Sequence, residues 1–267
     1  MSSPEPVGVF DSGMGGLTVV RELINQLPNE SIIYFGDTAR VPYGPKSPDT
    51  VLRYSREITS YLRGEGIKAL VVACNTATAH ALPALRREFD FPIVGVIEPG
   101  ARAAARATRT QRVGVIGTAG TIKSRAYEKE IHKLLPEATL TAQACGLFVP
   151  LVEEGWLDTE PTRAIARNYL APFVTAEVDT LVLGCTHYPL IKTVIGNVVG
   201  RDVRLIDSAH ETAREAAEVL RAKGLQNDYP NEARYRFIAS DAPETFLQLG
   251  QRFLGSAIDR VEARTLG

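Results

Sequence analysis

This 267-residue chain has few or none of the sequence features of a membrane protein, a nucleic-acid-binding protein or a disulfide-bonded protein. Lysine and arginine number 30 against 31 aspartate and glutamate residues, so the formal net charge is −1 and no basic excess indicates nucleic acid or an anionic membrane. The apolar runs are far too short to span a bilayer. Residues 1–6 have neither a basic region nor an apolar stretch, so we expect no signal peptide.

Cysteine is also rare. The chain has three cysteines, an odd number, and none of them forms a CxxC pair. This count argues against a disulfide framework and favours a cytoplasmic protein with reduced thiols. The histidines show no spacing typical of metal ligands, so we expect no metal site. They are His80, His132, His187 and His210.

An internal repeat is built around two of the cysteines. Residues 69–73 form an apolar run of strand length that ends at Cys74, and residues 180–184 form a second run that ends at Cys185. The two cysteines are 111 positions apart (185 − 74). Segments 7–13 and 113–119 also resemble each other. The repeat indicates two similar halves, each with one thiol at the carboxyl end of a strand.

Apolar strands alternate with helical patterns along the chain, which predicts an α/β protein with parallel sheets. The strand before Cys74 has no polar alternation, as expected when helices cover both faces of a sheet. We expect a first domain from residues 1–98 and 208–267 and a second from residues 99–207. The two similar domains are expected to face each other about a pseudo-twofold axis, with the active site between them.

Three expectations concern local structure. Residues 98–100, Glu-Pro-Gly, are expected to interrupt the alternation of elements. A single helix is expected from about residue 124 to residue 135. Glu153 and Trp156 are expected in a loop.

The positions of Cys74 and Cys185 suit acid–base chemistry. Ligands of doubly wound sheets bind beyond the carboxyl ends of the strands. A thiol at that edge faces a helix N-terminus, whose partial positive charge stabilises a thiolate. One thiolate can remove a proton from carbon while the opposite thiol delivers one, which inverts the configuration. A free cysteine is usually a small buried hydrophobe, and we expect this of Cys145, but the matched pair favours catalysis.

The turn at residues 13–18, Gly-Met-Gly-Gly-Leu-Thr, lies between a strand and a helix, as a dinucleotide fingerprint does. Its third glycine is replaced by Thr18, and the charge of Asp11 is unfavourable beside a pyrophosphate. A glycine turn at a helix N-terminus binds carboxylate as readily as phosphate. We therefore expect no cofactor. Thr118 and Thr121 bound the equivalent turn of the second half and offer the same donors.

Three other side chains are candidates with two readings each. His187 lies two residues after Cys185 and can polarise that thiol or act as a base, or it can be an inert histidine at a strand–helix junction. Asp37 and Glu153 are either site acids or solvated loop acids. The sequence leaves these alternatives open.

Taken together, these motifs resemble the glutamate racemases of the cofactor-independent aspartate/glutamate racemase family. The similarity covers nearly the whole chain and rests on segments 10–18, 42–44, 73–76 and 184–189. It implies interconversion of L-glutamate and D-glutamate without pyridoxal phosphate or metal. It also implies two facing α/β domains, the first completed by the C-terminal segment, a supply of D-glutamate for peptidoglycan, and a homodimer.

The resemblance further implies roles for single residues. Cys74 and Cys185 are the implied acid–base thiols, and the implied auxiliary acids and bases are Asp11, Asp37, Glu153 and His187. The implied substrate contacts are Asp11, Ser12, Pro42, Tyr43, Gly44, Asn75, Thr76, Thr186 and His187, to which the repeat adds Thr118 and Thr121.

Three other functions compete with this interpretation. An aspartate racemase, or another racemase of the same superfamily, would perform identical chemistry on a different acid. A thiol-nucleophile hydrolase built on Cys185 and His187 would leave Cys74 unexplained. A non-catalytic binding protein for acidic ligands predicts that loss of the thiols leaves function intact.

Overall fold

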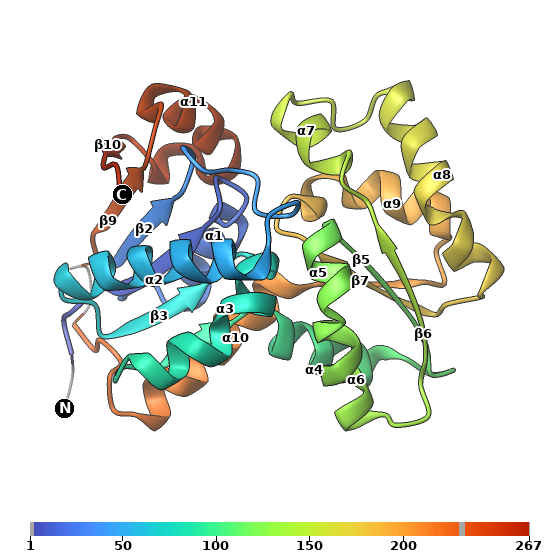
Figure 1. Cartoon of the computed structure of the whole chain (residues 1–267), viewed down its shortest axis with the longest axis horizontal. Helices are drawn as coiled ribbons and strands as arrows, with labels where there is room; N and C mark the ends of the chain where they lie inside the picture. Colours follow the sequence, from blue (N-terminus) through green and yellow to red (C-terminus); the bar gives the residue numbers. More distant parts are fainter. Residues whose placement is uncertain (1–2, 230–232, 267) are drawn as a thin grey trace. The chain divides into compact units, whose positions relative to one another are not determined.

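The computed structural model describes residues 3–229 and 233–266. Residues 1–2, 230–232 and 267, which the expected first domain also includes, lie outside the described residues. The chain packs as two compact units: unit 1 is Met1–Val96 with Ala209–Gly267, and unit 2 is Ile97–Ser208. Each unit has a parallel sheet with helices packed on it, which confirms the predicted α/β class (Figure 1).

In the part of the chain that the structure describes, unit 1 has a six-stranded sheet in the order β10-β9-β2-β1-β3-β4. The strands are β1 (Val7–Asp11), β2 (Ile32–Gly36), β3 (Ala69–Val72), β4 (Ile93–Gly95), β9 (Tyr235–Ala239) and β10 (Glu262–Ala263). The helices are α1 (Leu17–Gln26), α2 (Pro48–Gly64), α3 (Asn75–Glu88), α10 (Ser208–Ala222), α11 (Pro243–Leu254) and the short η2 (Gly255–Ala257). The C-terminal segment therefore adds two strands beside β2.

Both faces of this sheet are covered. Phe10 and Phe35 belong to a buried cluster with side chains of α2 and α3. On the other face, the Tyr34 ring packs against Phe246 of α11, with 5.9 Å between ring centroids. The strands need no polar alternation because each face meets a helix layer.

Unit 2 has four parallel strands in the order β6-β5-β7-β8, counted over the described residues. They are β5 (Arg112–Gly117), β6 (Thr139–Ala144), β7 (Thr180–Gly184) and β8 (Arg204–Asp207). The helices are α4 (Ile97–Ala107), α5 (Ala119–Ser124), α6 (Ala126–Leu134), α7 (Phe148–Glu153), α8 (Glu160–Thr175), η1 (Tyr188–Ile191) and α9 (Lys192–Val199). Helices α7, α8 and α9 share a buried cluster with β5 and β7, while α4 packs against α6 and β7.

The repeat seen in the sequence recurs in the strand pairing. β1 lies between β2 and β3, with Phe10 opposite Val72. β5 lies between β6 and β7 in the same way, with Ile116 opposite Leu183. The two cysteines of the repeat each follow two residues after Val72 and Leu183. They therefore occupy equivalent positions, one at the carboxyl edge of each sheet.

Residues 98–100 do not interrupt the alternation of elements. They lie inside α4, where Pro99 is tolerated because the amides of a first turn have no helical partner. The helix expected from about residue 124 to residue 135 is α6, and Arg125, whose φ of 54° lies in the left-handed region, separates it from α5. Trp156 lies in a loop as expected, but Glu153 ends the short helix α7.

Candidate active site

The Cys74 thiol is held by the start of α3 and by the turn after β1. The side chain is buried and caps α3, because its sulfur accepts a hydrogen bond from the Ala77 amide at 3.4 Å. The thiol also donates to Ser12 Oγ at 3.7 Å. Burial and, to a smaller extent, the charge of Asp11 raise the pKa of Cys74 to about 12, against the lowering effect of the hydrogen bonds with Ala77 and Ser12. At neutral pH this group therefore carries its proton.

The glycine turn after β1 is closed on the carboxylate of Asp11. Asp11 Oδ2 accepts from the Gly13 amide at 3.2 Å and from the Gly16 amide at 3.1 Å. Gly16 has no room for a side chain, since a Cβ there would lie 2.6 Å from the Asp11 Cβ. The carboxylate bound by the amides of this turn is therefore that of Asp11, a residue of the chain itself. This use of the amides disfavours a pyrophosphate at the turn.

Asp37 is a buried anchor of the loop that follows β2. Its carboxylate accepts from Arg40 Nε at 2.8 Å, from Ser240 Oγ at 2.9 Å and from the Tyr43 hydroxyl. It is fully buried, so it is not a solvated loop acid. Burial raises the pKa of Tyr43, and the charges of Asp37 and Cys74 add to this effect. Asp37 therefore fixes Tyr43 close to the Cys74 thiol.

The same loop contacts the glycine turn. A Cβ at Gly13 would lie 3.3 Å from a methyl group of Val41, which precedes Pro42, Tyr43 and Gly44. Unit 1 thus brings together the expected residues from three strand ends. They are Asp11 and Ser12 after β1, Tyr43 in the loop after β2, and Cys74, Asn75 and Thr76 after β3.

Unit 2 surrounds Cys185 with a different set of groups. His187 Nδ1 lies 3.8 Å from the Cys185 sulfur, and His187 Nε2 lies 3.0 Å from Glu153 Oε1. Burial lowers the pKa of His187, but the bonds and charges of Cys185 and Glu153 outweigh it and raise the pKa to about 10. The histidine is therefore an imidazolium at neutral pH.

The remaining expected contacts of unit 2 lie at strand ends as well. Thr118 follows β5 and caps α5, with its hydroxyl 3.1 Å from that of Thr121. Thr186 is buried directly after Cys185. The hydroxyls of unit 2 thus follow β5 and β7, as Ser12 and Thr76 follow β1 and β3 in unit 1.

Cys145 is a core residue near the second thiol. It is fully buried, and its thiol donates to the Gln143 carbonyl at 3.7 Å. Burial raises its pKa to about 12, with a smaller effect from the charge of Cys185. In the repeat it occupies the place of Asp37, because each follows the strand paired with β1 or β5. These contacts favour the structural role expected for it.

Two tyrosines near the thiols were missed from the sequence. Tyr34 and Tyr127 are buried, and the charges of Cys74 and Cys185, respectively, act on their hydroxyls. Tyr34 lies in an apolar strand and Tyr127 in a short helix, where an aromatic residue is ordinary core. No signal in the sequence distinguished them.

Two kinds of site are absent from residues 3–229 and 233–266, the described part of the chain. No group of three or more histidine, cysteine, aspartate or glutamate side chains could hold a metal ion there. No helix there is long and apolar enough to cross a bilayer.

Comparison with known proteins assigns the family. A model of the family described as Asp/Glu/Hydantoin racemase matches residues 7–216. The chain belongs to this family. A curated member, the glutamate racemase of Geobacter metallireducens, is 57% identical over 255 residues, which are 96% of this chain and 94% of that protein.

Solved structures of other members agree with this family assignment. The glutamate racemase isoform RacE1 from Bacillus anthracis matches with a TM-score of 0.93 and 42% identity, over 98% of this chain and 97% of that one. The glutamate racemase of Francisella tularensis, solved in complex with D-glutamate, matches with a TM-score of 0.92 and 38% identity, over 98% of both chains. The resemblance seen in the sequence and the expected class of amino-acid racemase are confirmed.

Proposed function

We propose that this racemase interconverts L-glutamate and D-glutamate by a two-thiol reaction at Cα. The observation that carries the proposal is the equivalence of Cys74 and Cys185, each at the carboxyl edge of its own parallel sheet. Cys145, the third cysteine, also follows a strand end, that of β6, but the equivalent position in unit 1 is Asp37, so it has no matching thiol. A reaction that inverts one carbon needs a proton acceptor on one face and a donor on the other, and the repeat provides one such group twice.

The proton balance of the reaction is simple. One thiolate takes the Cα proton, so that the C–H bond breaks, an S–H bond forms and the electron pair remains on the substrate as a carbanion. The opposite thiol then gives its proton to the other face of Cα and becomes a thiolate. No electron is gained or lost, and the two thiols exchange protonation states. The step requires Cys74 and Cys185 to reach one Cα.

The surroundings of the two sulfurs differ. Cys74 holds its proton because burial and the charge of Asp11 raise its pKa to about 12. Cys185 instead lies 3.8 Å from Nδ1 of His187. We assign Cys185 as the proton acceptor and Cys74 as the proton donor in one direction of the reaction. Asp11 and His187 then act as auxiliary groups for the reverse direction, with Glu153 acting through His187.

The Cα–H of an amino acid is a very weak acid, so the carbanion needs support from the protein. Donors aimed at the substrate carboxylate stabilise charge that develops there. We assign this task to the hydroxyls and amides of Ser12, Thr76 and Thr186. Thr76 and Thr186 follow Cys74 and Cys185 closely in the chain, and Ser12 Oγ accepts a hydrogen bond from the Cys74 thiol. Tyr43, Gly44, Asn75, Thr118 and Thr121 complete the proposed substrate contacts.

The reaction as proposed uses no cofactor, and Asp37 supports it only by holding Tyr43. We further propose that the protein acts in the cytoplasm as a homodimer and supplies D-glutamate for peptidoglycan. The relatives named as glutamate racemases support glutamate as the substrate. Dialysis against a chelator should leave activity unchanged, and dependence on added pyridoxal phosphate would overturn the two-thiol reaction.

Circular dichroism of the purified protein with each amino acid tests the substrate. We expect the signal of L-glutamate to decay to zero and that of L-aspartate to persist. Decay with L-aspartate alone would identify an aspartate racemase. Binding of glutamate without any decay would favour the binding protein for acidic ligands.

A further inference from the structure

Each unit places a buried tyrosine hydroxyl behind the strand end that carries its thiol. In unit 1, the Tyr34 hydroxyl donates to the Gly13 carbonyl at 2.8 Å. A Cβ at Gly16 would lie only 2.9 Å from the same hydroxyl and 3.0 Å from the Ala73 Cβ. Tyr34 therefore fills the space between the glycine turn and the residue that precedes Cys74.

In unit 2, Tyr127 of α6 fills the corresponding space. A Cβ at Gly184, the residue before Cys185, would lie 3.0 Å from the Tyr127 ring and 2.6 Å from the Ile116 carbonyl oxygen. The Tyr127 hydroxyl is hydrogen-bonded to Ser208, the last residue of unit 2. The Ile116 carbonyl by itself excludes a side chain at position 184, and the Tyr127 ring packs closely against the same glycine behind the thiol strand.

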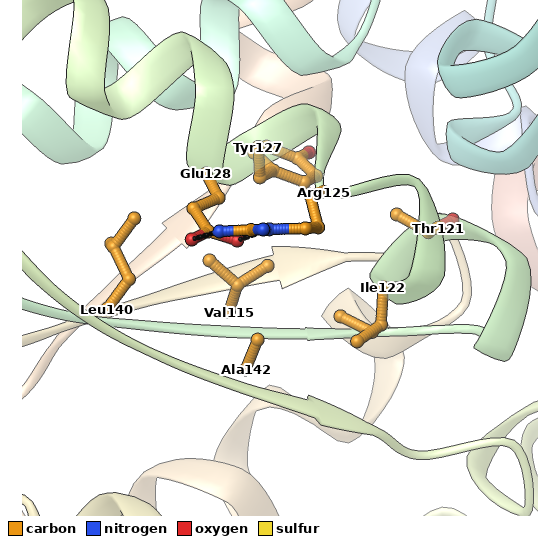
Figure 2. A pocket seen from close by; sticks show the side chains of 8 residues that line it. All are labelled: Val115, Thr121, Ile122, Arg125, Tyr127, Glu128, Leu140 and Ala142. Carbon is orange, nitrogen blue, oxygen red and sulfur yellow. Dashed lines mark hydrogen bonds and ion pairs between the residues drawn. The ribbon is translucent and has the colours of Figure 1, made fainter.

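The two tyrosines come from elements that the repeat does not relate. Strand pairing places Tyr34 opposite Val9, and the equivalent position opposite Val115 is Ala142. Without a ring at position 142, a surface pocket of about 60 Å³ remains over β5 and β6. Figure 2 shows this pocket with Tyr127 at its rear and the Arg125–Glu128 ion pair beside it.

A tyrosine behind one thiol would be ordinary core packing. Here the same place is filled in both units, once from a strand and once from a helix, although the repeat would supply alanine in the second. Burial is the main cause that raises the pKa of both hydroxyls, and the neighbouring cysteines, Cys74 at Tyr34 and Cys185 at Tyr127, add to it. The Tyr34 hydroxyl bonds the glycine turn, and the Tyr127 hydroxyl bonds Ser208 at the start of α10.

We propose that Tyr34 and Tyr127 are positioning residues, each fixing the strand end that carries one thiol. The Tyr34 bond to Gly13 holds the turn with Asp11 and Ser12 against Cys74. The Tyr127 ring and its bond to Ser208 hold Gly184 and Cys185. The effect of these residues on racemisation rests on the proposed function, whereas their effect on the thiols does not.

Alkylation of the full chain with iodoacetamide tests the proposal, with each cysteine quantified by peptide mass spectrometry. Loss of one hydrogen bond eases local opening, so Tyr127→Phe should speed alkylation of Cys185 by about threefold and leave Cys74 unchanged. Tyr34→Phe should do the reverse. Each variant carries its own internal control, because general loosening would affect both thiols. Equal changes at both cysteines, or none, would overturn the proposal.

Kinetics with glutamate provide the second measurement. We expect each variant to lower kcat by about fivefold with KM within about twofold, because the substrate contacts remain. Tyr61→Phe is the matched control, since it removes a tyrosine hydroxyl that is bonded to Glu65 just after α2, and it should leave kcat unchanged. If Tyr34→Phe and Tyr127→Phe have the same kcat as Tyr61→Phe, the two tyrosines are not positioning residues. A wild-type protein inactive on glutamate would refute the proposed function and leave the alkylation result decisive.

Discussion

The Nε2 atom of His187 lies 3.0 Å from a carboxylate oxygen of Glu153. Burial alone would lower the pKa of this histidine, and its contacts with Cys185 and Glu153 together raise it to about 10. The Glu153 carboxylate acts on Cys185 through the His187 ring, whose Nδ1 lies 3.8 Å from the Cys185 sulfur. Glu153 is therefore a positioning residue, which acts on the thiol through another side chain.

The first prediction follows from this pair. Glu153→Gln should move the alkaline limb of the pH–kcat profile to lower pH, because His187 loses a charge that raises its pKa to about 10. We expect kcat at neutral pH to fall about tenfold. Steady-state rates across the pH range measure both effects. Glu154→Gln, a neighbouring exposed carboxylate, is the control and should match the wild type.

The same histidine makes stability depend on pH. Its folded pKa of about 10 lies above the ordinary value of 6.5, so its protonation stabilises the fold fully below pH 6.5 and this contribution is lost as pH rises toward 10. Urea unfolding at both ends of this window, for the wild type and His187→Gln, measures the effect. The difference in unfolding free energy should shrink as pH rises. A constant difference would show that His187 is neutral in the folded protein.

The three cysteines should differ sharply in their tolerance of alanine. Cys74→Ala and Cys185→Ala should each lower kcat by at least about a thousandfold, because inversion needs a group on both faces of Cα. Cys145→Ala should retain most activity, since its thiol bonds only a backbone carbonyl. Racemisation assays on folded variants decide this. Full activity of Cys74→Ala or Cys185→Ala would show that the thiol removed has only a structural role.

Asp37 offers a contrast between a catalytic and a positioning carboxylate. Asp37→Asn replaces an acceptor by a donor among Arg40, Tyr43 and Ser240, which all donate to it. We expect a loss of about 1–3 kcal/mol in unfolding free energy together with a moderate fall in kcat. Denaturant titration measures the change in unfolding free energy, and steady-state rates on the same sample measure the change in kcat. Abolished activity at unchanged stability would instead make Asp37 an acid–base group.

The sequence was sufficient where local chemistry decides the structure. Runs of buried apolar residues located β1, β3 and β7, and Ser47 with Pro48 located the start of α2, where Ser47 Oγ accepts from the Thr50 amide. The repeat located both thiols at strand ends. Local patterns failed where tertiary packing decides. Pro99 indicates a break in the sequence but lies in a first helical turn, and Glu153, expected in a loop, ends α7.

The candidate site shows the same division. The two-residue spacing of Cys185 and His187 was enough to suspect their contact. Nothing near Glu153 indicated that a short helix would bring it to His187, 34 residues away. Tyr127 likewise reaches Gly184 only through the packing of α6 on the sheet. Contacts between elements far apart in sequence leave no periodic signal in either of them.

Isotope labelling tests the assignment of two separate thiols. In deuterated water, a single base serving both faces could return the abstracted proton to either side, so recovered substrate and product would both gain deuterium. With two thiols, the abstracting group holds the substrate's own proton while the opposite group carries solvent deuterium. Early in the reaction from L-glutamate, D-glutamate should therefore carry deuterium at Cα and recovered L-glutamate should remain largely protiated.

Mass spectrometry of the separated enantiomers at low conversion reads out this difference, and the reaction from D-glutamate is the internal control. The pattern should then invert, because Cys74 and Cys185 exchange roles with the direction of the reaction. Burial of both thiols slows exchange of their protons with solvent, which keeps the substrate's proton on the abstracting sulfur long enough to be observed. Rapid labelling of recovered L-glutamate to the level of the product would contradict the pairing of the two thiols.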